Sequence, residues 1–323
     1  MRSIVNAVIG CAAVLACTTA LAADFPKRAV TIVVPFPAGG TTDVLARHLG
    51  KALAERWQQP VVIENKGGAS GTIGSADVAR SKPDGYRMLV TATHHLINPT
   101  LLKETIPYDT KSAFTNVALV ATVPNVLVVN KNFEAKTVQE LVDLAKKDPG
   151  KINFGSAGVG GANHLSGELF AHMAGIKLTH IPYRGAAPSL NDLLAGQIPM
   201  MFDSVPGVLA HIQSGSLRAL GVTTKERVAQ LPEVPTIAES GIKNFEATSI
   251  FGLYGPKDMP RPVLEKISTD VNLVLQSSAI KEQFATLGAT PGNMPQSEFN
   301  AYVNKEIDKW AEVIKQANIS LPK

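Results

Sequence analysis

The stretch Pro35–Asp43, PFPAGGTTD, decides how the chain can fold, because it joins two segments of different hydrophobic periodicity. Before it, Val30–Val34 is β-branched and nearly all apolar, as is typical of a strand covered on both faces. After it, apolar side chains recur from Val44 to Trp57 at the spacing of a helix that buries one stripe. The pattern predicts a strand, a glycine turn and a helix.

The glycine turn has the composition of an anion-binding loop. Gly39 and Gly40 have no Cβ, so backbone N–H groups can converge there, and the free N–H groups of the first helical turn point the same way. A carboxylate or phosphate would be held without a cation. A tight strand-to-helix connection explains the same residues, so this stretch alone does not establish a site.

A second copy of the pattern lies in the other half of the chain. Lys151–Phe154 predicts a short strand, Gly155–Gly161 is again rich in glycine, and a helix begins near Asn163. Two such loops in different halves predict two jaws that close on one anion.

The first residues have the features of an export signal. Arg2 precedes the apolar run Ala7–Ala16, and Ala20–Ala22 supplies the small residues of a cleavage site, so we expect cleavage near Ala22 and a periplasmic protein. Lipoprotein processing at Cys17 is the alternative. Both cysteines lie in this leader, so the mature chain would contain no disulfide and no thiol nucleophile.

Composition excludes several classes of protein. The 323 residues suffice for about two domains, and 45% hydrophobic with 18% charged residues indicates a globular chain. The net charge of +4 falls to +3 without Arg2, and no dense basic cluster suggests nucleic acid or a membrane surface. No later stretch is apolar for about 20 residues. We expect a soluble monomer.

Strands and helices alternate along the mature chain, which predicts α/β domains with doubly wound parallel sheets and ligands at the carboxyl ends of the strands. The long apolar run Val117–Val129 and the run Ser249–Pro256 are where the chain would cross between domains. The predicted organisation is a signal peptide at 1–22, a first domain at 23–122 plus 254–323, and a second domain at 123–253.

Several motifs together resemble the Bug family of periplasmic solute receptors, the TctC-like substrate-binding proteins of tripartite tricarboxylate transporters. They are Pro35–Asp43, Val61–Gly71 (VVIENKGGASG), Lys82–Tyr86 (KPDGY), Ser156–Leu165 (SAGVGGANHL) and Pro182–Gly185 (PYRG). The resemblance covers essentially the whole mature chain. It implies a two-domain, hinged periplasmic-binding-protein fold of type II that closes on a small carboxylate, held by backbone groups of both glycine loops and by bridging waters.

The candidate ligand-binding residues come from the two glycine loops and the strand ends beside them. They are Phe36, Ala38, Gly39, Gly40, Thr41, Thr42, Thr93, His94, Ser156, Ala157, Gly158, Gly160, Gly161, His164, Tyr183 and Asp203. We expect no catalytic residue, no metal and no cofactor.

Four candidates also have a structural interpretation. Asp43 lies in a first helical turn, where the helix dipole favours a carboxylate. His94 and His95 would face opposite ways on a strand and so could not form one metal site. His164, with Glu168 and His172 on the same helical face, would suit a solvated face better than a metal.

Asp203 is the candidate for selectivity. It ends the apolar run Met200–Phe202, and on a strand it would point into the cleft. There it would accept a hydrogen bond from a ligand amine or hydroxyl and repel a second carboxylate. A helix cap is the alternative.

The sequence therefore predicts a receptor that captures a di- or tricarboxylate, an amino acid or an aromatic acid for permease subunits of a tripartite tricarboxylate transporter. A receptor that informs a signalling partner is an alternative. A hydrolytic enzyme is another, although neither a nucleophile elbow nor a phosphate loop occurs.

Overall fold

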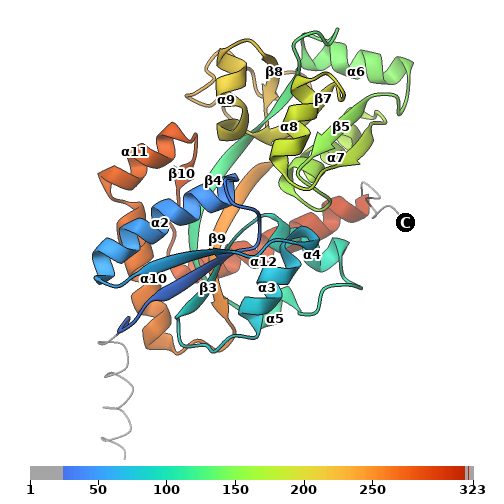
Figure 1. Ribbon diagram of the computed structural model, residues 1–323. Coiled ribbons are helices and arrows are strands. Elements are labelled where there is room, and N and C mark those ends of the chain that lie inside the picture. The colour runs from blue at the N-terminus through green and yellow to red at the C-terminus, as the bar shows by residue number, and fades with distance from the viewer. Residues whose placement is uncertain (1–24, 317–318, 320–323) are drawn as a thin grey trace, which may run out of the picture.

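The apolar runs of the sequence form the parallel strands of two lobes, seen one above the other in Figure 1. The computed structural model describes residues 25–316 and 319. The predicted leader, its cleavage site near Ala22 and Cys17 lie outside these residues.

The first lobe contains three parallel strands in the order β2-β1-β3. They are β1 (Val30–Val34), β2 (Val61–Asn65) and β3 (Arg87–Ala92). The remaining elements of this lobe are α2 (Thr41–Trp57), η1 (Ala69–Gly71), α3 (Thr72–Ala79), α4 (His94–Leu101), α5 (Thr110–Ala113), α10 (Arg261–Leu275), α11 (Ser278–Thr286), β10 (Thr290–Pro291) and α12 (Gln296–Gln316).

The second lobe repeats this plan with the order β7-β5-β6. Its strands are β5 (Asn153–Ser156), β6 (Thr179–Pro182), β7 (Met200–Ser204) and the antiparallel β8 (Leu217–Val222). Its helices are α6 (Val138–Lys147), α7 (Ala162–Ala174), α8 (Ala186–Leu194) and α9 (Val205–Gln213).

Helices cover both faces of each sheet, as the doubly wound prediction requires. In β1, Ile32 belongs to one hydrophobic cluster and the next residue, Val33, to another. In β7, Phe202 and Met201 divide in the same way. Successive side chains of a strand point to opposite faces, so each sheet has a core on both sides.

Two long strands join the lobes, β4 (Phe114–Asn130) and β9 (Thr248–Pro256), and Figure 1 shows both running from one lobe toward the other. β4 pairs antiparallel with β9 as far as Pro124 and with β7 from Asn125 onward. The alternating pattern did not predict this antiparallel junction. We keep the domain boundaries at 122/123 and 253/254 as a proposal. The first lies two residues before the point, between Pro124 and Asn125, where β4 changes its pairing partner.

His94 and His95 lie just past the end of β3 at Ala92 and begin α4. The expectation that they would face opposite ways on a strand therefore does not apply to them.

A buried carboxylate ties the C-terminal helices to the first lobe. Asp270 of α10 accepts hydrogen bonds from Arg56 Nε and Trp57 Nε1 of α2, each at 2.6 Å, and from Lys266 Nζ. Burial alone would raise the pKa of Asp270, but the hydrogen bonds from Lys266, Arg56 and Trp57 outweigh it and hold that pKa below its usual value. The carboxylate is therefore charged and fully partnered.

Asp270→Ala should lower the free energy of unfolding by about 3 to 5 kcal/mol, because it leaves a buried indole N–H and two cations without their acceptor. The control is Asp308→Ala, which removes the exposed ion pair with Lys111 Nζ at 2.7 Å and should cost less than about 1 kcal/mol. Urea denaturation measures both. Equal losses of unfolding free energy in the two variants would show that the buried cluster around Asp270 stabilises the protein no more than an exposed ion pair does.

Candidate functional site

Asp43 holds the first glycine loop in place, and both of its carboxylate oxygens accept hydrogen bonds within the protein. Asp43 Oδ2 accepts from the Gly39 N–H and from Arg47 Nε, both at 2.9 Å, and Oδ1 accepts from Asn65 Nδ2 at 2.8 Å. Burial would raise the pKa of Asp43, but the bonds from Arg47, Gly39 and Asn65 hold it below its usual value. The Arg47 charge is therefore paired with Asp43.

The second glycine loop is held by a hydroxyl and a histidine. The Gly158 N–H donates to Ser156 Oγ at 3.1 Å, and the Gly160 N–H donates to His164 Nδ1 at 3.2 Å. Gly158 and Gly160 have φ of +130° and +79°, which glycine adopts readily. Since the N–H groups of Gly39, Gly158 and Gly160 already donate to protein groups, an anion would accept from other N–H groups of the two loops or from the first turns of α2 and α7.

Those two helices begin in the same way. Gly40 is the N-cap of α2 and Gly161 that of α7, and neither helix has a side-chain capping bond. The first N–H groups of a helix have no intrahelical acceptor, and the helix dipole adds partial positive charge there. Both starts therefore have donors that an acceptor from outside the helix could bind.

The lobes touch where these loops lie. Thr41 Oγ1 is 3.1 Å from Ser204 Oγ, and Ser70 Oγ donates to the Val159 carbonyl at 2.9 Å. A Cβ placed on Gly161 would lie 2.6 Å from His94 Nε2, so only glycine allows this approach. The structure therefore brings residues of both predicted jaws together across the interlobe boundary.

Three histidines contact the second glycine loop, and two of them, His94 and His180, are neutral rings. The His94 ring lies 4.9 Å from that of Phe36, and the His164 ring stacks on His180 at 3.9 Å. Burial, with a smaller contribution from His164, lowers the pKa of His94 to about 4 and that of His180 to about 3. The rings of His94 and His180 therefore supply hydrogen-bonding groups here, not cations.

His164 and Glu168 pair at 3.5 Å between Nε2 and Oε1. Among the residues that the structure describes, no group of three or more histidine, cysteine, aspartate or glutamate side chains is arranged to hold a metal ion.

Asp203 lies near the end of strand β7, as the first interpretation expected, and the N-cap of the following helix is Ser204. Its Oδ1 accepts from the Ser204 N–H at 2.7 Å and from Asn163 Nδ2, in the first turn of α7, at 3.0 Å. Its Oδ2 is buried without a partner. Burial raises the pKa of Asp203 to about 6, with the bonds from Ser204 and Asn163 acting in the opposite direction.

The other predicted residues divide into partnered and open ones. Thr93 Oγ1 accepts from the Ile250 N–H at 2.9 Å, and the Tyr183 hydroxyl donates to Asp192 Oδ2 at 2.7 Å, so both have structural partners. Thr42 is buried, Ala157 is half-buried, and Ala38 is exposed beside the first loop.

Sequence reasoning missed Ser204 and Asn125. Asn125 is 1% exposed and lies where β4 leaves β9 for β7. Its Oδ1 accepts from Ser249 Oγ at 3.0 Å, whereas its Nδ2 has no partner. An asparagine directly after Pro124 in an apolar run was the available signal.

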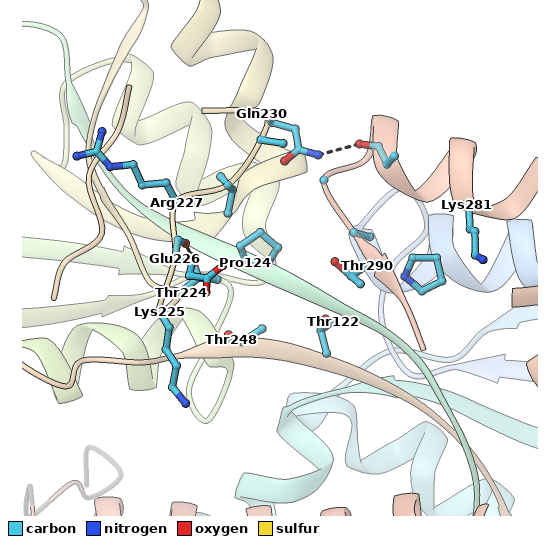
Figure 2. A pocket seen from close by; sticks show the side chains of 16 residues that line it. Thr122, Pro124, Thr224, Lys225, Glu226, Arg227, Gln230, Thr248, Lys281 and Thr290 are labelled. Atoms are coloured by element: carbon cyan, nitrogen blue, oxygen red, sulfur yellow. Dashed lines mark hydrogen bonds between the residues drawn. The ribbon is translucent and has the colours of Figure 1, made fainter. Parts of the chain in front are cut away.

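A second interlobe feature is a groove of about 570 Å³ beside the joining strands, shown in Figure 2. Thr122 and Pro124 of β4 and Thr248 of β9 line it, together with the loop Thr224–Gln230 and the end of α11. Gln230 Nε2 donates to the Ala285 carbonyl at 3.0 Å between the lobes. None of the predicted ligand-binding residues lines this groove.

No helix in residues 25–316 is both long and apolar enough to cross a membrane.

Comparison with known proteins identifies the family. Residues 45–319 match the family described as the tripartite tricarboxylate transporter family receptor, TctC. The periplasmic binding protein BugD has a similar structure, with a TM-score of 0.84 and 37% identity, covering 92% of this chain and 99% of BugD.

Two further solved structures contain ligands. The R. palustris protein Rpa4515, solved with adipate, has a TM-score of 0.87 and 36% identity over 92% of this chain and 99% of its own. MatC from Rhodopseudomonas palustris, solved with bound malate, has a TM-score of 0.83 and 30% identity over 90% of this chain and 100% of its own. The chain therefore belongs to the TctC, or Bug, family of periplasmic solute-binding receptors.

Proposed function

We propose that this protein is an exported receptor that captures one small organic carboxylate between its lobes and delivers it to permease subunits of a tripartite tricarboxylate transporter. The observation that supports the proposal most is that two uncapped helix starts, at Gly40 and Gly161, both lie at the interlobe boundary, where Thr41 contacts Ser204 and Gly161 packs against His94. A carboxylate has the charge and the acceptors that both starts lack.

The mechanism is closure of the lobes. A ligand carboxylate that accepts from the first turns of α2 and α7 makes bonds to both lobes only when they are together, so binding stabilises the closed state. The hydroxyls of Thr41 and Ser204, 3.1 Å apart in this arrangement, belong to the same closed contact. Because Arg47 is committed to Asp43, the charge of the ligand is balanced mainly by helix N–H groups.

The ligand class follows from the family and from this site. The related receptors were solved with adipate and malate, and we propose a di- or tricarboxylate, an amino acid or an aromatic acid here. Asp203 Oδ2 is the group that would select among them, because it would accept from a ligand amine or hydroxyl.

Two alternatives are less well supported. A signalling receptor would use the same site and differ only in its partner. For a hydrolase, Ser156 Oγ lies 2.6 Å from His180 Nε2, which superficially resembles a nucleophile and base. Ser156 is fully buried and its oxygen holds the Gly158 N–H, while burial lowers the pKa of His180 to about 3 and makes it a weak base.

Gly40→Asp tests the anion site in the first jaw. A Cβ at Gly40 would meet nothing closer than the Pro37 carbonyl at 3.9 Å, and φ of −78° suits any residue. Aspartate is a favoured N-cap, so the variant should fold. A ligand carboxylate about 4 Å away would be repelled by roughly 4 kcal/mol at an effective dielectric near 20.

Allowing for screening, the dissociation constant of Gly40→Asp should rise at least about tenfold. Calorimetry with malate, succinate, adipate, citrate, glutamate and benzoate provides the measurement, and Gly40→Asn is the control of equal size without charge. If the Asp and Asn variants bind equally well, no carboxylate lies at this helix start.

Asp203→Asn tests whether this carboxyl is buried in the folded protein. Its pKa is raised to about 6 from 3.8, so its stabilising contribution is present below pH 3.8 and is lost as the pH rises through 6. Relative to the unsubstituted protein, the free energy of unfolding of the variant should rise by about 2 kcal/mol between pH 4 and pH 7. Urea titrations across that range measure it, and a constant difference would mean an ordinary, solvated Asp203.

A further inference from the structure

We propose that Asn125 is a ligand-positioning residue, whose side-chain amide Nδ2 donates a hydrogen bond to the bound carboxylate from the strand that joins the two lobes. The inference rests on the proposed function and deepens it, because it adds a donor in the hinge to the donors in the two jaws.

The first observation is an unpaired donor in a buried place. Asn125 is 1% exposed and its Nδ2 has no hydrogen-bond partner in the protein. Burying an amide donor without a partner is unfavourable, so an acceptor supplied by a ligand would be favoured at this place. Because Oδ1 accepts from Ser249 Oγ at 3.0 Å, the amide group is held in one orientation, and Nδ2 cannot turn toward another acceptor without breaking this hydrogen bond.

The second observation is the direction in which this donor lies. Asn125 is the register partner of Ser204 in the antiparallel pair β4–β7, so their Cα atoms are about 5 Å apart and their side chains share one face. Ser204 Oγ is the group that meets Thr41 Oγ1 across the lobes at 3.1 Å. Asn125 therefore lies under the point where the closed lobes touch, next to the start of α2.

The groove of Figure 2 lies elsewhere. Thr122 and Pro124 line that groove and alternate along β4 with Asn125, which does not line it. Successive strand residues point to opposite faces, so Asn125 is directed away from the groove and toward the side of Ser204.

The third observation is how firmly Asn125 is held between segments of both lobes. Its backbone N–H donates to Thr223 Oγ1 at 3.1 Å, and its side chain is held by Ser249 of β9. Pairing of β4 changes from β9 to β7 at this residue. A ligand that accepts a hydrogen bond from Asn125 would therefore contact the segment of β4 that must bend when the lobes close.

The test compares two substitutions that break the same hydrogen bond. Asn125→Ala and Ser249→Ala both remove the contact between Ser249 Oγ and Asn125 Oδ1, but only the first removes the amide donor. Asn125→Asp is a further variant that keeps the shape and the acceptor for Ser249 while replacing the donor with an oxygen. Each is titrated at pH 8 by calorimetry with the same six acids, malate, succinate, adipate, citrate, glutamate and benzoate, and its melting temperature is measured without acid.

We expect Asn125→Ala and Asn125→Asp to weaken the acid that binds the unsubstituted protein by about tenfold or more, the effect of losing a hydrogen bond to a charged group. Ser249→Ala should lower the melting temperature while changing the dissociation constant by less than about threefold. Where Asn125→Ala does not fold, Asn125→Asp decides.

Dissociation constants within twofold of the unsubstituted value for the folded Asn125 variants would overturn the inference. So would an equal loss of affinity in Ser249→Ala, because the role of Asn125 would then be structural. If the unsubstituted protein binds none of the six acids, the proposed function fails. If the unsubstituted protein binds an acid and the Asn125 variants bind it equally well, only the inference about Asn125 fails.

Discussion

The proposed ligand site depends on the N–H groups at the starts of α2 and α7, which have no side-chain cap. Each helix follows a glycine loop whose own N–H groups are partly used inside the lobe, by Asp43 in one case and by His164 in the other. What remains for an outside acceptor is the first helical turn, where the dipole favours an anion. With glycine at both N-caps, no side chain competes for these donors.

The joining strands determine whether the two helix starts can meet. β4 pairs with strands of the first lobe up to Pro124 and of the second lobe from Asn125, so a small rotation at this point moves one jaw against the other. The close approach of Gly161 to His94, and of Thr41 to Ser204, leaves no room for larger side chains or for a displaced lobe. In the proposed mechanism, closure and anion binding are one process, in which the ligand replaces water as the acceptor.

Much of this fold could be predicted from the sequence because its signals are local. The β-branched run at Val30–Val34, the glycines after it and the helical stripe of α2 needed only neighbouring residues. The antiparallel joining strands could not be predicted in this way, because their pairing is set by residues more than 100 positions apart. Likewise, Asn125 became a candidate only once β7 and β9 were placed beside it, and the sequence pattern did not show that the chain begins a helix at His94, two residues after β3.

The most direct test of this interpretation is the identity of the molecule that the cleft holds. Purified protein is denatured, the released small molecules are identified by mass spectrometry, and the acid found is titrated back into ligand-free protein beside its amide. We predict one organic acid per chain, recovered chemically unchanged, with the amide bound at least about tenfold more weakly because it lacks the charge that the two helix starts require. Equal binding of acid and amide, or steady conversion of the acid into product, would contradict a receptor built around a carboxylate.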